Sequence, residues 1–179
     1  MRSSMFADSI VFICAHNIDG CMGFIINKPH ELTLDGLLDR VDGVEHDAIA
    51  SANSLVSPHQ LIRMGGPVDE NRGFILHSSD YEADATIPVT EDISLTSTLS
   101  ILHDIANQRG PRQAMVSLGY AAWEYNQLEQ EIADNDWLTL DTLPDDLVFN
   151  DQLIDKYDDA LGMIGIRSRA LYVSEPGHA

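Results

Sequence analysis

Positive charge is scarce in this chain, which has 10 Lys and Arg residues against 29 Asp and Glu among its 179 residues. The formal net charge is −19, and a surface of that sign repels phosphate groups. The basic residues are also scattered singly, so they form no stripe of the kind that binds a nucleic-acid backbone. We therefore expect no direct nucleic-acid partner and no membrane surface as a partner.

Cysteines and long apolar runs are also few. Two cysteines are too few for a secreted disulfide framework, which favours a reducing compartment. No apolar run approaches the length of about 18 residues that a membrane-spanning helix needs. The first residues lack the apolar core of a signal peptide. The sequence therefore predicts a soluble cytoplasmic protein.

The common catalytic and metal-binding motifs are missing as well. The seven histidines show no H-x-x-x-H or H-E-x-x-H spacing, and there is no C-x-x-C pair. No G-x-S-x-G elbow supports serine hydrolase chemistry. We expect no metal site and no cofactor, and the sequence favours a protein that is not an enzyme.

What the chain does have is the composition of a globular protein, with 44% hydrophobic and 22% charged residues. Its length predicts one domain over residues 1–179. Apolar β-branched stretches predict strands at 9–16, 22–27, 61–64, 72–77, 114–118 and 137–140, with an edge strand at 86–90. Helical periodicity predicts helices at 33–41, 92–108, from 126 onward and at 153–164, and most of 42–57 is expected to be a loop. Hairpins mixed with strand–helix pieces indicate an α+β fold with a mixed sheet.

The first strand carries a candidate reactive thiol. Cys14 and His16 are two residues apart, so they should face the same side of a strand, where an imidazole can activate a thiolate. The apolar neighbours on that face favour an inert core cysteine instead. A turn at 17–20 would place Cys14 opposite Gly23, so we expect no disulfide to Cys21, which should be exposed near the turn.

Glycines and aromatic residues mark two further places. The Gly65-Gly66-Pro67 run could hold an anion on backbone N–H groups, but a tight strand-to-strand turn explains it better. Tyr120 and Trp123 lie at a predicted strand-to-helix corner, where they would act either as interface anchors or as core residues. After this corner, Asn126 and Glu129 have the spacing of a helix capping box.

Acidic residues are concentrated between positions 129 and 159, where eleven carboxylates accompany one basic residue, Lys156. A solvated face that keeps the protein soluble is the simpler interpretation. The alternative is a docking surface for a basic segment of another protein.

The order of several segments carries a family resemblance. The segments are SIVFICAHN (9–17), GCMGFIINKP (20–29), GGPV (65–68), RGFILH (72–77), GYAAW (119–123), QLEQE (127–131), WL (137–138) and GHA (177–179). Together they resemble the AlgH-like (YqgE-type) family of small bacterial proteins. The resemblance implies an α+β fold in which a mixed β-sheet forms a partial barrel with flanking helices. It also implies a bacterial cytoplasmic protein with no established activity, although some members are labelled as transcriptional regulators.

The chain departs from the family pattern in three places. Members usually begin with a further segment of the type G-x-F-L-I-A-x-P, so we expect one strand to be missing before Met1 and a sheet edge to be open. Asn126 stands where the family usually has Gly, which the predicted cap would explain. Cys21 stands where the family has Ala, and nothing in the sequence explains that change.

These observations favour a non-enzymatic regulatory or interaction protein that acts through a protein partner. The candidate surface residues are Asn27, Gly65, Gly66, Pro67, Arg72, His77, Tyr120, Trp123, Gln127 and Glu129. The alternative is a small-molecule-binding protein or an enzyme that uses Cys14 with His16 or His77. A transcriptional regulator that binds DNA directly ranks third because of the net charge.

Overall fold

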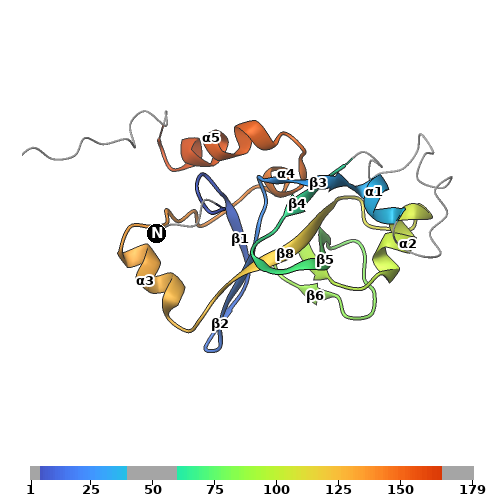
Figure 1. Ribbon diagram of the computed structural model, residues 1–179, viewed down its shortest axis with the longest axis horizontal. Helices are drawn as coiled ribbons and strands as arrows, with labels where there is room; N and C mark the ends of the chain where they lie inside the picture. The colour runs from blue at the N-terminus through green and yellow to red at the C-terminus, as the bar shows by residue number, and fades with distance from the viewer. Residues whose placement is uncertain (1–4, 40–59, 167–179) are drawn as a thin grey trace, which may run out of the picture.

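One mixed sheet organises the chain in a computed structural model that describes residues 5–39 and 60–166 (Figure 1). In this part the strands are β1 (Val11–Asn17), β2 (Gly20–Ile25), β3 (Pro29–Thr33), β4 (Leu61–Met64), β5 (Val68–Ser78), β6 (Ile87–Pro88), β7 (Ile93–Thr96) and β8 (Ala114–Trp123). The helices are α1 (Leu34–Leu38), α2 (Ser100–Ala106), α3 (Gln127–Ala133), α4 (Asp145–Phe149) and α5 (Leu153–Met163). The predicted α+β class is confirmed.

Strand β8 holds the sheet together. The strand order is β1-β2-β8-β5-β7-β6, and β4 also pairs with β8 while β3 pairs with β4. The β4–β8 pairing is parallel and the other pairings are antiparallel, so the sheet is mixed as predicted. The sheet curls into a half-barrel, and Figure 1 shows β8 running through its middle, with α3 and α5 toward one end and α1 and α2 toward the other.

Three apolar clusters fix the helices to the sheet. One packs α1 and α2 against Ile62, Ile75 and Val116. A second joins Phe24 and Phe74 of the sheet to Val148 and Phe149 of α4. The third lies beneath α3 and contains Cys21, Ala121, Trp123 and Leu128. Burial of these side chains at roughly 25 cal/mol per Å² is the main force that positions the surfaces described below.

Several elements are confirmed close to their predicted places. The β1–β2 hairpin turns at residues 17–20, β4 covers 61–64, and Pro88 lies in the short edge strand β6. Helix α1 begins after Thr33, whose Oγ1 accepts a hydrogen bond from the Gly36 N–H at 3.3 Å. Helix α5 matches the predicted final helix. The loop predicted over most of 42–57 lies outside the described residues.

The helix predicted at 92–108 is wrong in its first part. Residues Ile93–Thr96 form β7, which pairs with residues 75–78 of β5, and only Ser100–Ala106 is helical. Leucines at 95, 99 and 102 match a helical period, but residues 93–96 are buried on both faces of a strand, which periodicity cannot distinguish from a helix.

Other boundaries also differ from the predictions. Strand β5 begins at Val68 rather than at the predicted residue 72, because a bulge between Val68 and Gly73 lets the strand continue through residues 69–71. Residues 137–140 form no strand, and β3 and α4 were not predicted. Pro29 begins β3, a position where its missing N–H is tolerated.

The Gly65-Gly66 pair marks a close crossing of two backbones. The predicted strand at 114–118 is too short: β8 continues to Trp123. Gly119, within this strand, has a φ of 71°. A Cβ atom at Gly65 would lie 2.3 Å from the Gly119 carbonyl oxygen, and one at Gly66 would lie 2.2 Å from the Tyr120 carbonyl carbon. The glycines therefore serve this approach between strands, which agrees with the turn interpretation rather than with anion binding.

We expect Gly66→Ala to lower the free energy of unfolding by about 1–3 kcal/mol, because the added methyl group meets backbone atoms that cannot rotate away. Urea denaturation followed by circular dichroism measures the change. Gly73→Ala is the matched control, since a Cβ there meets nothing within 4 Å. Equal midpoints for the two variants would contradict the crossing.

Candidate interaction surfaces

An aromatic cluster closes the corner between the β1–β2 hairpin, the end of β8 and α3. The ring centroids of Phe6 and Trp137 lie 5.7 Å apart, and those of Trp123 and Trp137 lie 5.9 Å apart. Both indole N–H groups donate to Glu131 Oε2, from Trp123 at 2.9 Å and from Trp137 at 2.7 Å. Gln127 Nε2 donates to the other carboxylate oxygen at 2.9 Å. One carboxylate thus fixes three side chains, from the end of β8, from α3 and from the segment after α3.

The charge of Glu131 suits this role. Partial burial opposes ionisation, but the hydrogen bonds from Trp137, Trp123 and Gln127 outweigh it and lower the pKa of Glu131. Trp123 is only 6% exposed, so of the two alternatives predicted for it the structure supports a core residue. A rigid base therefore lies under this corner.

Exposed side chains surround that base. His16 Nε2 lies 2.5 Å from Glu129 Oε1, a contact that joins β1 to α3. Hydrogen bonds from the Glu129 backbone and from His16 lower the pKa of Glu129. Ile18 at the hairpin turn is 83% exposed, and Tyr125, between β8 and α3, is 71% exposed. We call the residues His16, Ile18, Tyr125, Gln127 and Glu129 the corner surface.

The hairpin and the end of β8 meet directly at this corner. A Cβ atom at Gly20 would lie 2.3 Å from the Trp123 carbonyl oxygen, so only glycine permits the approach. Gln127 Oε1 also accepts the Glu124 N–H at 2.9 Å and steadies the turn into α3. Ile18 and Tyr125 therefore extend from backbone segments that are held against each other.

The predicted capping box at the start of α3 is wrong. Asn126 has a φ of 61° and its side chain makes no capping hydrogen bond. This left-handed conformation is one that glycine adopts freely and that asparagine tolerates better than most residues. The left-handed backbone is a physical reason for Asn126 at a position where the resemblance implies Gly.

The candidate thiol on β1 is placed differently from the prediction. A β-bulge between Ile13 and Ala15 takes Cys14 out of register, so Gly23 lies opposite Ile13. Burial, with a smaller contribution from Cys21, raises the pKa of Cys14 to about 12. Cys21 is buried rather than exposed, and burial raises its pKa too. His16 contacts Glu129, so the thiol–imidazole pair is not formed; these observations agree with an inert Cys14.

His77 was a candidate for both the interaction surface and the catalytic alternative, but its side chain is fully buried. Nδ1 lies 2.9 Å from the Ser78 carbonyl oxygen and Nε2 lies 2.9 Å from Thr96 Oγ1. A neutral ring that donates from Nδ1 and accepts at Nε2 satisfies both contacts, and burial lowers the pKa of His77 accordingly. His77 is therefore not part of an exposed surface.

The remaining candidates do not gather at the corner. Asn27 is buried and holds the N-terminal segment, accepting from the Ile10 N–H and donating to the Asp8 carbonyl oxygen, both at 2.8 Å. Arg72 is exposed and lies over the Phe74 ring at 5.1 Å, and Tyr120 packs edge-on against the same ring at 5.4 Å. Of the predicted set, the structure brings together Trp123, Gln127 and Glu129.

Two buried cations were missed by the sequence analysis. Arg63 of β4 and Lys156 of α5 have no exposed surface. Arg63 donates to the Ile26, Leu61 and Asn150 carbonyl oxygens at 3.2, 2.6 and 3.0 Å, and to Asp151 Oδ1 at 2.6 Å. Lys156 Nζ donates to the Val148 carbonyl oxygen at 3.0 Å. Burial, aided by the charge of Arg63, lowers the pKa of Lys156 to about 7.

The burial of Lys156 removes the one positive charge from the surface of the 129–159 region. Lys156 is the only basic residue in this stretch, and its ammonium group does not reach the surface. The signal in the sequence was its position three residues after Leu153, which places it on the apolar side of α5. The surface of this region therefore displays carboxylates without a compensating cation of its own.

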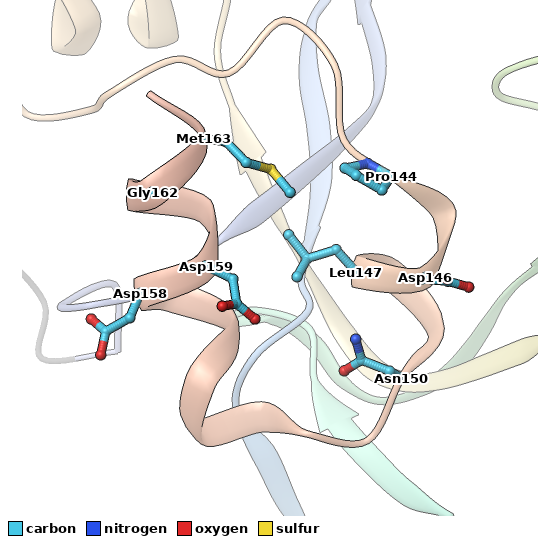
Figure 2. Close-up of a pocket in the computed structure, with 8 residues that line it drawn as sticks. All are labelled: Pro144, Asp146, Leu147, Asn150, Asp158, Asp159, Gly162 and Met163. Atoms are coloured by element: carbon cyan, nitrogen blue, oxygen red, sulfur yellow. The ribbon is translucent and has the colours of Figure 1, made fainter. Parts of the chain in front are cut away.

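A groove of about 470 Å³ lies between α4 and α5 (Figure 2). Its lining consists of Pro144, Asp146, Leu147, Asn150, Asp158, Asp159, Gly162 and Met163. Over residues 5–39 and 60–166, no cluster of three or more His, Cys, Asp and Glu side chains is arranged to hold a metal ion. In the same part of the chain no helix is long and apolar enough to cross a membrane.

Comparison with known proteins places the chain. The family model described as AlgH-like matches residues 1–169. The chain belongs to the AlgH-like family. A UPF0301 protein of Sinorhizobium medicae is 43% identical over 179 residues, covering 100% of this chain and 88% of the relative. A UPF0301 protein of Agrobacterium fabrum is 45% identical over 175 residues, covering 97% and 85%.

Solved structures of the AlgH-like fold agree with this assignment. The solution structure of the AlgH protein from Pseudomonas aeruginosa matches with a TM-score of 0.76 and 34% identity, over 100% of this chain and 90% of that one. A crystal structure of a Corynebacterium diphtheriae protein matches with a TM-score of 0.70, over 98% and 86%, but at 19% identity it supports the fold alone. A shared fold does not carry an activity, so function must be argued from the surfaces of this AlgH-like chain.

Proposed function

We propose that this chain is a non-enzymatic regulatory protein that works in the cytoplasm by binding a protein partner, which docks on the corner surface. The observation that carries the proposal is the exposure of Ile18 and Tyr125 on a base that is already rigid. Interface hot spots are typically large side chains, Tyr among them, that lose little conformational freedom on binding. The Glu131 network supplies that rigidity here.

The charge of the corner surface indicates the chemistry of the partner. Glu124 and Glu129 are exposed beside the two apolar anchors, and the net charge of the whole chain is −19. Complementary potentials steer association and exclude partners of like charge. The proposed partner surface therefore has an apolar pocket with Lys and Arg residues at its rim, and a nucleic-acid surface does not fit this description.

The alternative of an enzyme built on Cys14 receives less support. A thiol whose pKa is raised to about 12 is protonated at neutral pH and is a poor nucleophile. His77 is enclosed by Thr96 and Ser78, both of which already occupy its ring nitrogens. Neither group is arranged to abstract a proton from a substrate at the surface.

Cross-linking inside the cell tests the proposal. A photoreactive amino acid replaces Tyr125 in the full chain, and we expect one dominant protein adduct whose cross-linked peptide is flanked by Lys or Arg. The matched control places the same reagent at Ile87, which is 58% exposed at the far edge of the sheet. Identical adducts at both positions, or none at Tyr125, would refute a docking role for the corner.

The partner identified in this way then allows a quantitative test. Tyr125→Ala removes an anchor, and a hot-spot residue contributes about 2 kcal/mol or more, so we expect affinity to fall about thirtyfold. Glu129→Gln should weaken binding less, and mainly at low salt. Glu91→Gln makes the same charge change at an exposed position on the connection before β7 and should leave affinity unchanged.

A further inference from the structure

The groove between α4 and α5 combines an apolar interior with acidic edges. In Figure 2 the side chains of Pro144, Leu147 and Met163 point toward one another across the gap between the helices. Met163 is 46% exposed and lies next to the exposed Pro144 in the lining, so the two form a continuous apolar area that faces solvent. The apolar groups therefore offer a contact surface that water alone occupies poorly.

Carboxylates border these apolar groups, and none of the lining residues is basic. Asp159 extends into the gap toward Asn150, whereas Asp146 and Asp158 point away from its centre (Figure 2). Lys156, the one cation of α5, is fully buried and donates to the Val148 carbonyl oxygen, so its ammonium group does not reach the surface of the groove. The electrostatic field of the groove therefore favours a positively charged occupant.

The base of the groove is held in place before any partner arrives. Arg63 donates to the Asn150 carbonyl oxygen and to Asp151, and so ties the α4–α5 connection to β4. Asn150 Oδ1 also accepts the Gln152 N–H at 3.1 Å, which orients its side chain. A groove that is already formed loses less entropy on binding than one that must close.

We propose that this groove receives a short segment of a partner protein in which one large apolar side chain is flanked by Lys or Arg. The apolar side chain would lie against Pro144 and Met163 above the buried Leu147, and the flanking cations would meet Asp159 in the gap and Asp146 at its outer edge. A volume of about 470 Å³ is in the range of pockets that hold a compact group with selectivity. This inference goes beyond the corner surface, because the groove is built from α4 and α5 and does not require the corner to be an interface.

Three synthetic peptides test the chemistry with the full chain by fluorescence anisotropy. The first alternates Lys with Leu, the second replaces every Lys with Glu, and the third replaces every Leu with Ser. We expect the Lys–Leu peptide to bind about tenfold more tightly than either of the others, because each lacks one of the two contacts. Equal binding of the Lys–Leu and Lys–Ser peptides would mean general attraction to an acidic protein, and would overturn the proposal.

Point variants then locate the binding. Met163→Ser and Asp159→Asn should each weaken the Lys–Leu peptide about tenfold. Leu99→Ser and Glu91→Gln are the matched controls, since they make similar changes at exposed residues outside the groove. Equal losses in groove and control variants, or no peptide binding at all, would also overturn it. Because the corner surface is tested by cross-links at Tyr125, either proposal can fail while the other stands.

Discussion

Arg63→Met is expected to lower the free energy of unfolding by about 3–5 kcal/mol, because each buried acceptor left without its donor costs about 1–3 kcal/mol. The substitution removes the donor to three carbonyl oxygens and leaves Asp151 without its buried partner. It also disconnects the α4–α5 connection from β4. Urea denaturation followed by tryptophan fluorescence measures the loss.

Two further variants separate the causes of this loss. Arg109→Met removes an exposed pair with Asp104, and such surface pairs contribute about 0–1 kcal/mol, so its effect should be small. Arg63→Lys keeps the charge, but its three donors sit on one nitrogen and cannot reproduce the contacts made by three separate guanidinium nitrogens, so its loss should fall between the other two. If Arg63→Met cost no more than Arg109→Met, the guanidinium would not be the link described above.

Lys156→Met is expected to raise stability at neutral pH and to remove part of its pH dependence. In the native chain the pKa of Lys156 is lowered from 10.5 to about 7, so between these values the unfolded chain binds more protons than the folded one. Stability therefore rises from about pH 7 to about pH 10, where the ammonium group no longer has to be buried. The gain in the variant at pH 7 should reach a few kcal/mol, since each unit of pKa shift corresponds to about 1.4 kcal/mol.

The measurement is the difference in unfolding free energy between the variant and the native chain from pH 6 to pH 10. We expect this difference to be largest at or below about pH 7 and to shrink as the pH rises. Burial raises the pKa of Cys14 and of Tyr81 to about 12, so these groups lower the stability at pH values above their ordinary pKa. Both residues are present in the variant and in the native chain, so their contribution cancels in the difference. Parallel pH profiles would contradict the burial of a lowered-pKa lysine.

The local sequence pattern predicted the elements that have one buried and one exposed face, or that are bounded by turn and capping residues. The turn residues around Gly20 and the capping Thr33 identified the hairpin and α1, because each works through neighbours in sequence. Strand β7 was taken for a helix since it is buried on both faces and shows no alternation. The Cys14 bulge follows from pairing with β2 and leaves no mark in a single strand.

The candidate surfaces also divide into contacts between residues close in sequence, which a sequence pattern can suggest, and contacts between distant residues, which it cannot. Trp123, Gln127 and Glu129 lie near one another in the fold because they are close in sequence, on β8 and the helix that follows. His16 and Glu129 are 113 positions apart, and Arg63 and Asp151 are 88 apart, so their contacts arise only from the folded sheet. Burial of a cation is rare enough that the residue type itself argued against it.

The central place of β8 also bears on how the chain folds during synthesis. Strands β2, β4 and β5 each pair with β8, which is not completed until Trp123 leaves the ribosome. The β1–β2 hairpin can form from local contacts. The free edge of β2, however, can pair only with β8, which is encoded about a hundred residues later, and β4 and β5 also lack this neighbour until then. Contacts at such sequence separation fold slowly and leave strand edges open meanwhile. We therefore expect a nascent chain stalled before residue 114 to expose unpaired strand edges, and release of the β8 segment to end that exposure.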